Sequence, residues 1–225
     1  MPHKIGQLRS FPLTDYLTEQ EQIQQLKNWI KQYGLSLLLG ILAALAITSG
    51  WHYWERQQNK MLMRASHLYD KLITLRSQNN LKEVVILSQK LKNHYTRTPY
   101  AQMAALMLAW DATQRKAYHE AEEQCRWVMD HSKERSIRQV ARLRLARIQI
   151  AQQQPEEALK SLTTVDDNTF IGLVDEVRGD AYLAQHNINA ARHAYQLALA
   201  EIPNVESTQP ILQMKYDNLA TRGAV

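Results

Sequence analysis

The pattern of hydrophobic and polar positions divides the chain into an uncharged apolar run near the N-terminus and a long region of mixed character behind it. No charged residue occurs from Gln32 to Trp54, and the centre of this run, Leu35 to Ile47, is almost entirely Leu, Ile and Ala. A helix rises about 1.5 Å per residue, so the run is long enough to cross a hydrocarbon core of roughly 30 Å. It predicts one transmembrane segment at residues 34–54.

Two other interpretations of this run fit less well. A cleaved signal peptide has a short basic head and a small-residue cleavage site, whereas this run begins only after Lys31 and ends in bulky aromatic residues. A buried core helix would carry more polar positions over five turns. We therefore expect an uncleaved signal-anchor, whose apolar core and interfacial aromatic belt include Leu35, Leu38, Leu42, Leu45, Trp51, Tyr53 and Trp54.

Within the run, Ser36, Gly40 and Ala44 follow one another at steps of four and so share one helix face. Small residues at this spacing let transmembrane helices approach closely. The face is a candidate contact with another membrane protein.

The segment before the run divides in two. Residues 1–17 contain two prolines and no apolar period, and we expect them to be a disordered tail. Thr18 and Glu21 have the spacing of a capping box. Apolar side chains then recur at steps of three and four, which predicts an amphipathic lead-in helix over residues 18–33; they are Ile23, Leu26, Ile30 and Tyr33.

Residues 55–225 have the composition of a helical domain. Ala, Leu, Gln, Lys and Arg dominate, Gly and Pro are rare, and no stretch alternates as a strand does. Turn signals recur at short intervals, among them Gln78 to Asn80, Gln154-Pro155 and His186-Asn187. Helices joined by such short loops pack as antiparallel neighbours, so the fold class expected is all-α.

The helices also repeat. Gly179-x2-Tyr182, Ala191-x3-Tyr195-x2-Ala198 and a closing Pro203 follow the tetratricopeptide pattern over most of one repeat. Degraded copies lie 33 residues earlier and a further 37 residues earlier, and a weak fourth copy surrounds Leu72 and Val84. A tetratricopeptide-like α-solenoid is therefore expected, with packing positions at Ala109, Ala121, Ala146, Ala158, Gly179, Tyr182, Ala191, Tyr195, Ala198 and Pro203.

Charge refines this interpretation without settling the topology. The net charge is +5 and the mean hydropathy −0.44, so the chain outside the run has ordinary soluble character. Basic residues prevail over Glu55–Lys116 and acidic residues over Glu156–Asp217. Anionic headgroups would attract the basic part, but a chance asymmetry explains the pattern equally well. Lys and Arg flank both ends of the span, and this leaves its orientation undecided.

No pattern typical of catalysis occurs in the chain. Phosphate-binding, dinucleotide-binding, nucleophile-elbow and zinc motifs are all missing, so no enzyme activity, cofactor or metal is expected. Arg135, Arg138 and Arg142 share a helix face and form a candidate basic stripe. It is either a solvated surface or a contact with an acidic protein or lipid surface. Without interleaved aromatics or a reader motif, nucleic acid is not an expected partner.

The order of these parts resembles the YfgM family of ancillary subunits of the SecYEG translocon. The resemblance covers roughly residues 15–220 and rests on an amphipathic head, a span and a repeat domain. The span ends in Gly50-Trp51-His52-Tyr53-Trp54, and the repeat domain carries Leu143-Arg144-Leu145-Ala146-Arg147-Ile148-Gln149 and Val177-Arg178-Gly179-Asp180-Ala181. The resemblance does not place the basic extension from Met1 to Phe11.

This resemblance implies a single-pass protein of the bacterial inner membrane, with a cytoplasmic N-terminus and a periplasmic repeat domain. It implies SecYEG and a membrane-anchored periplasmic chaperone of the prolyl isomerase type as partners, with unfolded clients in addition. The expected function is thus a non-enzymatic adaptor that assists newly translocated proteins. The alternative is a membrane-tethered regulator whose repeat domain binds a signalling protein in the cytoplasm.

Overall fold

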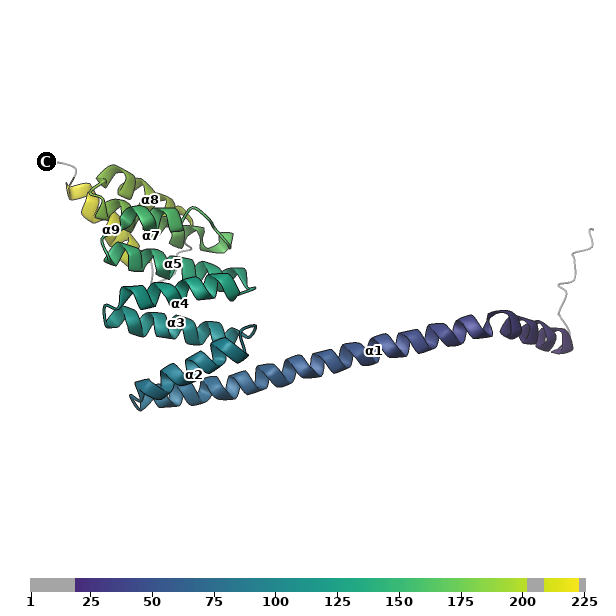
Figure 1. The fold of residues 1–225 in the computed structure, drawn as a ribbon. Helices are drawn as coiled ribbons and strands as arrows, with labels where there is room; N and C mark the ends of the chain where they lie inside the picture. The colour runs from purple at the N-terminus through teal and green to yellow at the C-terminus, as the bar shows by residue number, and fades with distance from the viewer. Residues whose placement is uncertain (1–18, 202–208, 223–225) are drawn as a thin grey trace, which may run out of the picture. The chain divides into compact units, whose positions relative to one another are not determined.

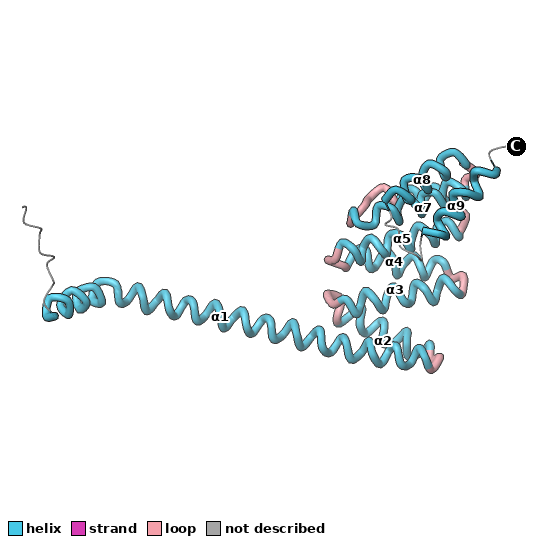
Figure 2. Tube along the Cα trace, turned by 180° about the vertical axis from the view of Figure 1, so that it is seen from behind, coloured by secondary structure: helices cyan, strands magenta, loops and turns pink. Residues whose placement is uncertain are grey.

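The computed structural model describes residues 19–201 and 209–222, and all regular structure in these ranges is helical, as predicted (Figures 1 and 2). The predicted tail at residues 1–17 and Pro203 lie outside the described residues. The chain divides into two compact units, Met1–Gln58 and Asn59–Val225. The elements are α1 (Glu19–Ser77), α2 (Leu81–His94), α3 (Pro99–Gln114), α4 (Tyr118–His131), α5 (Arg135–Ala151), α6 (Pro155–Ser161), the 3₁₀ turn η1 (Asn168–Phe170), α7 (Ile171–Ala184), α8 (Ile188–Glu201) and α9 (Gln209–Arg222).

The first unit contains the greater part of α1, which continues without interruption through the predicted lead-in helix and the predicted span. In the part of the chain that the structure describes, the apolar side chains of this unit are exposed. Leu35 is 72% exposed and Trp51 is 65% exposed. Among the described residues, α1 is the one helix long and apolar enough to cross a membrane.

The second unit consists of four helical hairpins followed by α9. The hairpins pair the last turns of α1 with α2, α3 with α4, α5 with α6, and α7 with α8. Short loops join the two helices of each hairpin, as Figure 2 shows. This is the predicted repeat architecture.

The same turn closes all four hairpins. A residue with φ of 60° follows the first helix each time, namely Asn79, Lys116, Gln153 and His186. The next N–H donates to the carbonyl five residues earlier, for example Asn80 to Leu75 at 3.0 Å and Asn187 to Tyr182 at 2.9 Å. This is the Schellman arrangement, which satisfies carbonyls at a helix end. The turns are spaced by 37, 37 and 33 residues, so the weak copy around Leu72 and Val84 is a structural repeat in register with the others.

Side-chain size is balanced between the two helices of each hairpin. The position seven residues before the turn residue holds Leu72, Ala109, Ala146 and Gly179 in successive hairpins, and the position nine residues after it holds Ser88, Cys125, Leu162 and Tyr195. All eight residues are buried. The largest side chain of the second set, Tyr195, lies opposite the smallest residue of the first, Gly179, where an added Cβ would overlap the tyrosine ring. Dense packing requires such compensation.

Helix α9 covers the end of the stack. Its Leu212 and Leu219 are 1% and 2% exposed and pack with Ala191, Tyr195 and Ala198 of α8. Terminal helices of this kind protect the apolar side of the last repeat, which has no following hairpin.

Candidate functional site

One position of the repeat faces away from the packed core. In the first helix of each hairpin, one residue directly follows the buried position seven residues before the turn. In chain order these residues are Ile73, Trp110, Arg147 and Asp180. Neighbours on a helix point about 100° apart, so a residue beside a buried one is turned toward the edge of that helix. Ile73 is 42% exposed and Trp110 is 53% exposed. This series runs from apolar to charged along the stack.

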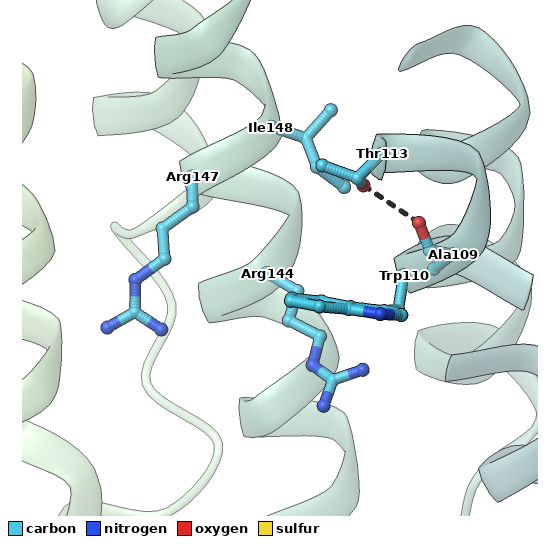
Figure 3. Close-up of a pocket in the computed structure, with 6 residues that line it drawn as sticks. All are labelled: Ala109, Trp110, Thr113, Arg144, Arg147 and Ile148. Atoms are coloured by element: carbon cyan, nitrogen blue, oxygen red, sulfur yellow. Dashed lines mark hydrogen bonds between the residues drawn. The ribbon is translucent and has the colours of Figure 1, made fainter. Parts of the chain in front are cut away.

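Two hollows lie along this series and together form what we call the groove. The first, of about 390 Å³, is lined by Ala109, Trp110, Thr113, Arg144, Arg147 and Ile148 (Figure 3). The second, of about 410 Å³, is lined by Tyr69, Ile73, Arg76, Met103, Leu106, Met107, Trp110 and Arg144. Trp110 and Arg144 line both, so the two hollows adjoin and together involve residues of α1, α3 and α5. Both volumes fall within the range of about 300–1,000 Å³ that is usual for ligand pockets.

The arginines of the groove differ in their partners. Arg76 donates to Asp111 at 2.6 Å, and Arg147 lies 3.7 Å from Glu176. Arg144 donates one N–H to the carbonyl of Leu106 at 2.9 Å and forms no ion pair with any carboxylate in residues 19–201 or 209–222. That hydrogen bond holds the guanidinium beside the Trp110 ring (Figure 3). The groove therefore contains an exposed aromatic ring next to a fixed positive charge that no described carboxylate pairs with.

The series ends in a closed polar network at α7. Lys215 of α9 donates to Glu176 at 2.7 Å and to both carboxylate oxygens of Asp180 at 2.8 and 2.9 Å. Tyr195 donates its hydroxyl to Asp180 at 2.7 Å. Burial raises the pKa of Tyr195, and Asp180 raises it further. Burial alone would lower the pKa of Lys215, but the two carboxylates outweigh it and the pKa is raised. Acidic groups at this end are thus neutralised from within the chain.

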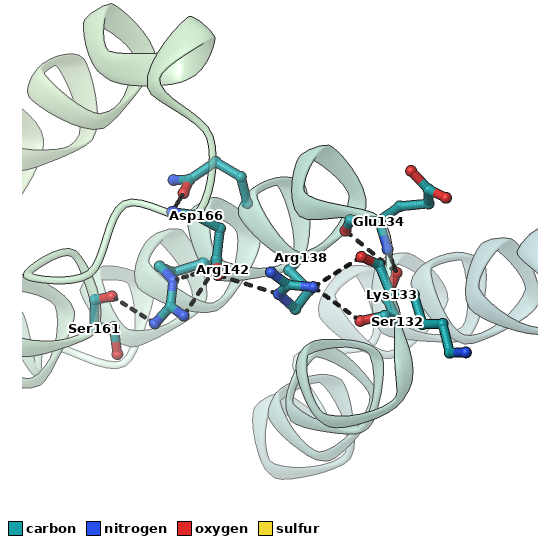
Figure 4. Close-up of polar contacts among 8 residues, drawn as sticks. Ser132, Lys133, Glu134, Arg138, Arg142, Ser161 and Asp166 are labelled. Carbon is teal, nitrogen blue, oxygen red and sulfur yellow. Dashed lines mark hydrogen bonds and ion pairs between the residues drawn. The ribbon is translucent and has the colours of Figure 1, made fainter. Parts of the chain in front are cut away.

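The predicted basic stripe is corrected by the structure. Arg138 and Arg142 do not form a free surface, because both bind the Asp166 carboxylate, at 3.1 and 2.9 Å (Figure 4). Arg138 also donates to the carbonyls of Ser132 and Lys133. Burial would raise the pKa of Asp166, but the hydrogen bonds from the two arginines lower it. Of the stripe, Arg135 is exposed. The sequence pattern could not indicate this pairing because Asp166 lies 24 residues beyond Arg142, in the loop before α7.

The predicted packing positions lie in the core wherever the structure describes them. Tyr182 is partly buried, and the others are buried; they are Ala109, Ala121, Ala146, Ala158, Gly179, Ala191, Tyr195 and Ala198. Tyr195 packs on Gly179 inside its own hairpin and also packs against α9. These residues position the groove without lining most of it.

The predicted span residues are all exposed along α1. Trp51 and Trp54 contact each other with ring centroids 5.9 Å apart. A Cβ added at Gly40 would meet no atom within 4 Å, so the face of Ser36, Gly40 and Ala44 is open.

No metal or redox site emerges from the part of the chain that the structure describes. No group of three or more His, Cys, Asp and Glu side chains is arranged there to hold an ion. Cys125 is fully buried, and burial raises the pKa of its thiol to about 12, which keeps it protonated and unreactive.

Sequence reasoning missed Trp110, Met103 and Ile73 as site residues. A signal for Trp110 was available, because it follows the repeat position Ala109 by one residue and a large aromatic there cannot join the same packed layer. Ile73 follows the weak repeat position Leu72 in the same way, whereas Met103 carried no such signal. Only the structure shows that Met103 and Ile73 line the same hollow as Tyr69, at 45% and 42% exposure.

Comparison with known proteins gives a consistent picture. The tetratricopeptide repeat-like domain family matches residues 27–221. The ancillary SecYEG translocon subunit of Neisseria gonorrhoeae is 30% identical over 207 residues, 91% of this chain and 98% of that protein. Proteins of the same name from Haemophilus influenzae and Escherichia coli are 27% and 25% identical over 90% and 91% of this chain, and 98% of each. No solved structure matches the chain. The chain belongs to the family of ancillary SecYEG translocon subunits, the YfgM family, and carries its tetratricopeptide repeat-like domain.

Proposed function

We propose that this chain is a non-enzymatic, membrane-anchored adaptor of the Sec translocon. The observation that carries this proposal is that translocon subunits match the chain over 98% of their own length, through the apolar helix as well as the repeats. In this proposal residues 34–54 anchor the protein in the inner membrane, and residues 55–225 form a binding domain in the periplasm. The face of Ser36, Gly40 and Ala44 supports lateral packing on a membrane partner.

The groove is the proposed binding surface of the repeat domain. Exposed apolar side chains that line adjoining hollows are typical of protein interaction sites, and Trp, Met and Arg are enriched at such sites. The proposed occupants are a membrane-anchored periplasmic chaperone of the prolyl isomerase type and newly translocated clients. The adaptor would hold them beside the channel through contacts alone.

Affinity purification in mild detergent tests the association. The full chain, tagged after Val225, should co-purify SecYEG and the chaperone. A matched variant with Gly40→Leu and Ala44→Leu keeps the apolar span but fills the small-residue face, and it should recover less SecYEG. Absence of SecYEG from the wild-type preparation would contradict the proposal.

Orientation is tested separately. A reporter enzyme that is active only in the periplasm, fused after Val225, should be active, and the same enzyme fused after Lys27 should be inactive. The reverse result would favour a cytoplasmic regulator and exclude the translocon function.

A further inference from the structure

We propose that the groove binds a protein segment in which a large apolar side chain is followed or preceded by a carboxylate, with Trp110 contacting the apolar group and Arg144 binding the carboxylate. This inference rests on the proposed adaptor function and names the chemistry of the segment that the adaptor would hold.

The apolar half of the site is formed by side chains that the domain leaves without cover. Trp110, Met103 and Ile73 are 53%, 45% and 42% exposed and line one hollow with Leu106. Burying such side chains against a ligand contributes about 25 cal/mol per Å² of apolar area. A segment with a Leu or aromatic side chain would gain this contribution, and a fully polar segment would not.

The polar half is formed by Arg144. Its guanidinium is positioned by the 2.9 Å hydrogen bond to Leu106 and lines both hollows beside Trp110. The neighbouring Arg76 and Arg147 already face Asp111 and Glu176. Arg144 is thus the groove arginine without an ion-pair partner among the described residues. A planar guanidinium with free N–H groups matches a carboxylate in a charge-assisted, bidentate geometry.

The charge distribution selects a peptide rather than nucleic acid as the occupant. Single-stranded nucleic acid requires a track of several unpaired cations and successive stacking aromatics. Among the described residues, the groove offers one arginine without an ion-pair partner, one exposed Trp and the partly buried Tyr69. At the end of the same series, Asp180 and the nearby Glu176 both bind Lys215, so they place no repulsive limit on an acidic segment.

Fluorescence anisotropy on the full chain in detergent micelles tests the inference. Three labelled probe peptides are used, GSAELFEASG, GSAKLFKASG and GSAESSEASG, which differ only in charge or in the apolar pair. The acidic apolar peptide should bind at least tenfold more tightly than either of the others, because one charge-assisted pair and one buried side chain each exceed a tenfold effect.

Substitutions at Arg144 and Trp110 test the polar and the apolar half of the site separately. Arg144→Gln should remove the preference for the acidic over the basic peptide, with about a tenfold loss for the acidic one. The matched control Arg135→Gln changes an exposed arginine of the same helix outside the groove and should bind all three peptides as the wild type does. Trp110→Ala should weaken both apolar peptides. Met103→Gln, a second groove substitution, should weaken both as well and guards against misfolding of the Trp110 variant.

Equal affinity for the acidic and basic peptides, or a preference that survives Arg144→Gln, would overturn the inference. So would binding of the polar peptide as tightly as the apolar one. Co-purification of SecYEG with the wild type separates these results from the proposed function. If SecYEG is recovered and the peptides are not discriminated, the groove chemistry is wrong and the adaptor function stands.

Discussion

The series Ile73, Trp110, Arg147 and Asp180 occupies one repeat position, which is exposed at one end of the repeat domain and covered at the other. At the α7 end, Asp180 is covered by α9 and paired with Lys215 and Tyr195. At the α1 and α3 end, Ile73 and Trp110 occupy the equivalent position and stay 42% and 53% exposed in the part of the chain that the structure describes. Helix α9 therefore gives the α7 end a cation and a packed surface, which the α1 and α3 end does not receive from the described residues. Where a cover exists, charges are neutralised and the position contributes to stability; where none exists, the side chains are available for a partner.

The largest effect on stability is expected where Gly179 of α7 packs on Tyr195 of α8. Gly179→Leu should lower the free energy of unfolding by about 3 kcal/mol, since a side chain there overlaps the Tyr195 ring. Thermal unfolding measures it. Gly179→Ala should lower the free energy of unfolding by less than Gly179→Leu does. The double variant Gly179→Ala with Tyr195→Leu should be more stable than Gly179→Ala alone, because Ala and Leu already occupy the two equivalent positions, 146 and 162, in the preceding hairpin. An unchanged melting temperature for Gly179→Leu would refute the size compensation.

The second largest effect on stability is expected at Asp166, which binds Arg138 and Arg142. Asp166→Asn should destabilise the domain by about 2 kcal/mol at pH 7, because it leaves Arg138 and Arg142 without their carboxylate. The folded-state pKa of Asp166 is lowered, so its contribution is complete above the ordinary value near 4 and is lost as pH falls through the folded pKa. Denaturant titrations from pH 7 to pH 3 should show the wild type and variant converging in acid. A difference independent of pH would contradict this account.

A third prediction concerns the ion pairs that join α9 to α7. Lys215→Met should destabilise the docking of α9 by about 1–2 kcal/mol, since it removes the cation that binds Asp180 and leaves Glu176 with Arg147, 3.7 Å away. The raised pKa of Lys215 means that this contribution is complete below about pH 10 and is lost as pH rises through the folded pKa. Hydrogen exchange of α9 amides measures it. Lys215→Arg should retain most of the protection, and equal loss in both variants would show that charge is not the cause.

The open end should tolerate change with the smallest effect on stability. Met103→Gln should alter the free energy of unfolding by no more than about 0.5 kcal/mol, because Met103 is 45% exposed. Met107→Gln, one turn later and 7% exposed, should cost about 2 kcal/mol through burial of an amide. Urea unfolding of the two variants compares them. If Met103→Gln is as costly as Met107→Gln, the open end is part of the core and not a groove.

Much of the fold could be predicted because it depends on local pattern. The apolar run, the repeat spacing and the turn signals each lie within a few residues or recur at a regular interval, and the helices begin and end close to those signals. The packing positions followed from the small residues of the repeat. The weakest repeat, around Leu72 and Val84, was predicted despite its large Leu72, and its partner position Ser88 is correspondingly small.

The candidate site was predicted poorly because it depends on contacts between distant segments. Arg138 and Arg142 had the periodicity of an exposed stripe, yet a carboxylate from a later loop binds both. Arg144 stood in the same basic helix with nothing in its neighbours to set it apart. Its distinction is the absence of a nearby carboxylate among the described residues, and this depends on which segments pack beside it.

Sequence patterns alone predict one apolar helix able to span a membrane, a tetratricopeptide-like repeat behind it and no recognisable catalytic motif. Hydrophobic periodicity and local turn chemistry are properties of short segments, and they act before distant parts meet. The tertiary structure alone decided which charges are neutralised and which apolar side chains remain open. Coulombic pairing and burial depend on distances of a few ångströms between residues far apart in the chain, and stacking the hairpins sets those distances.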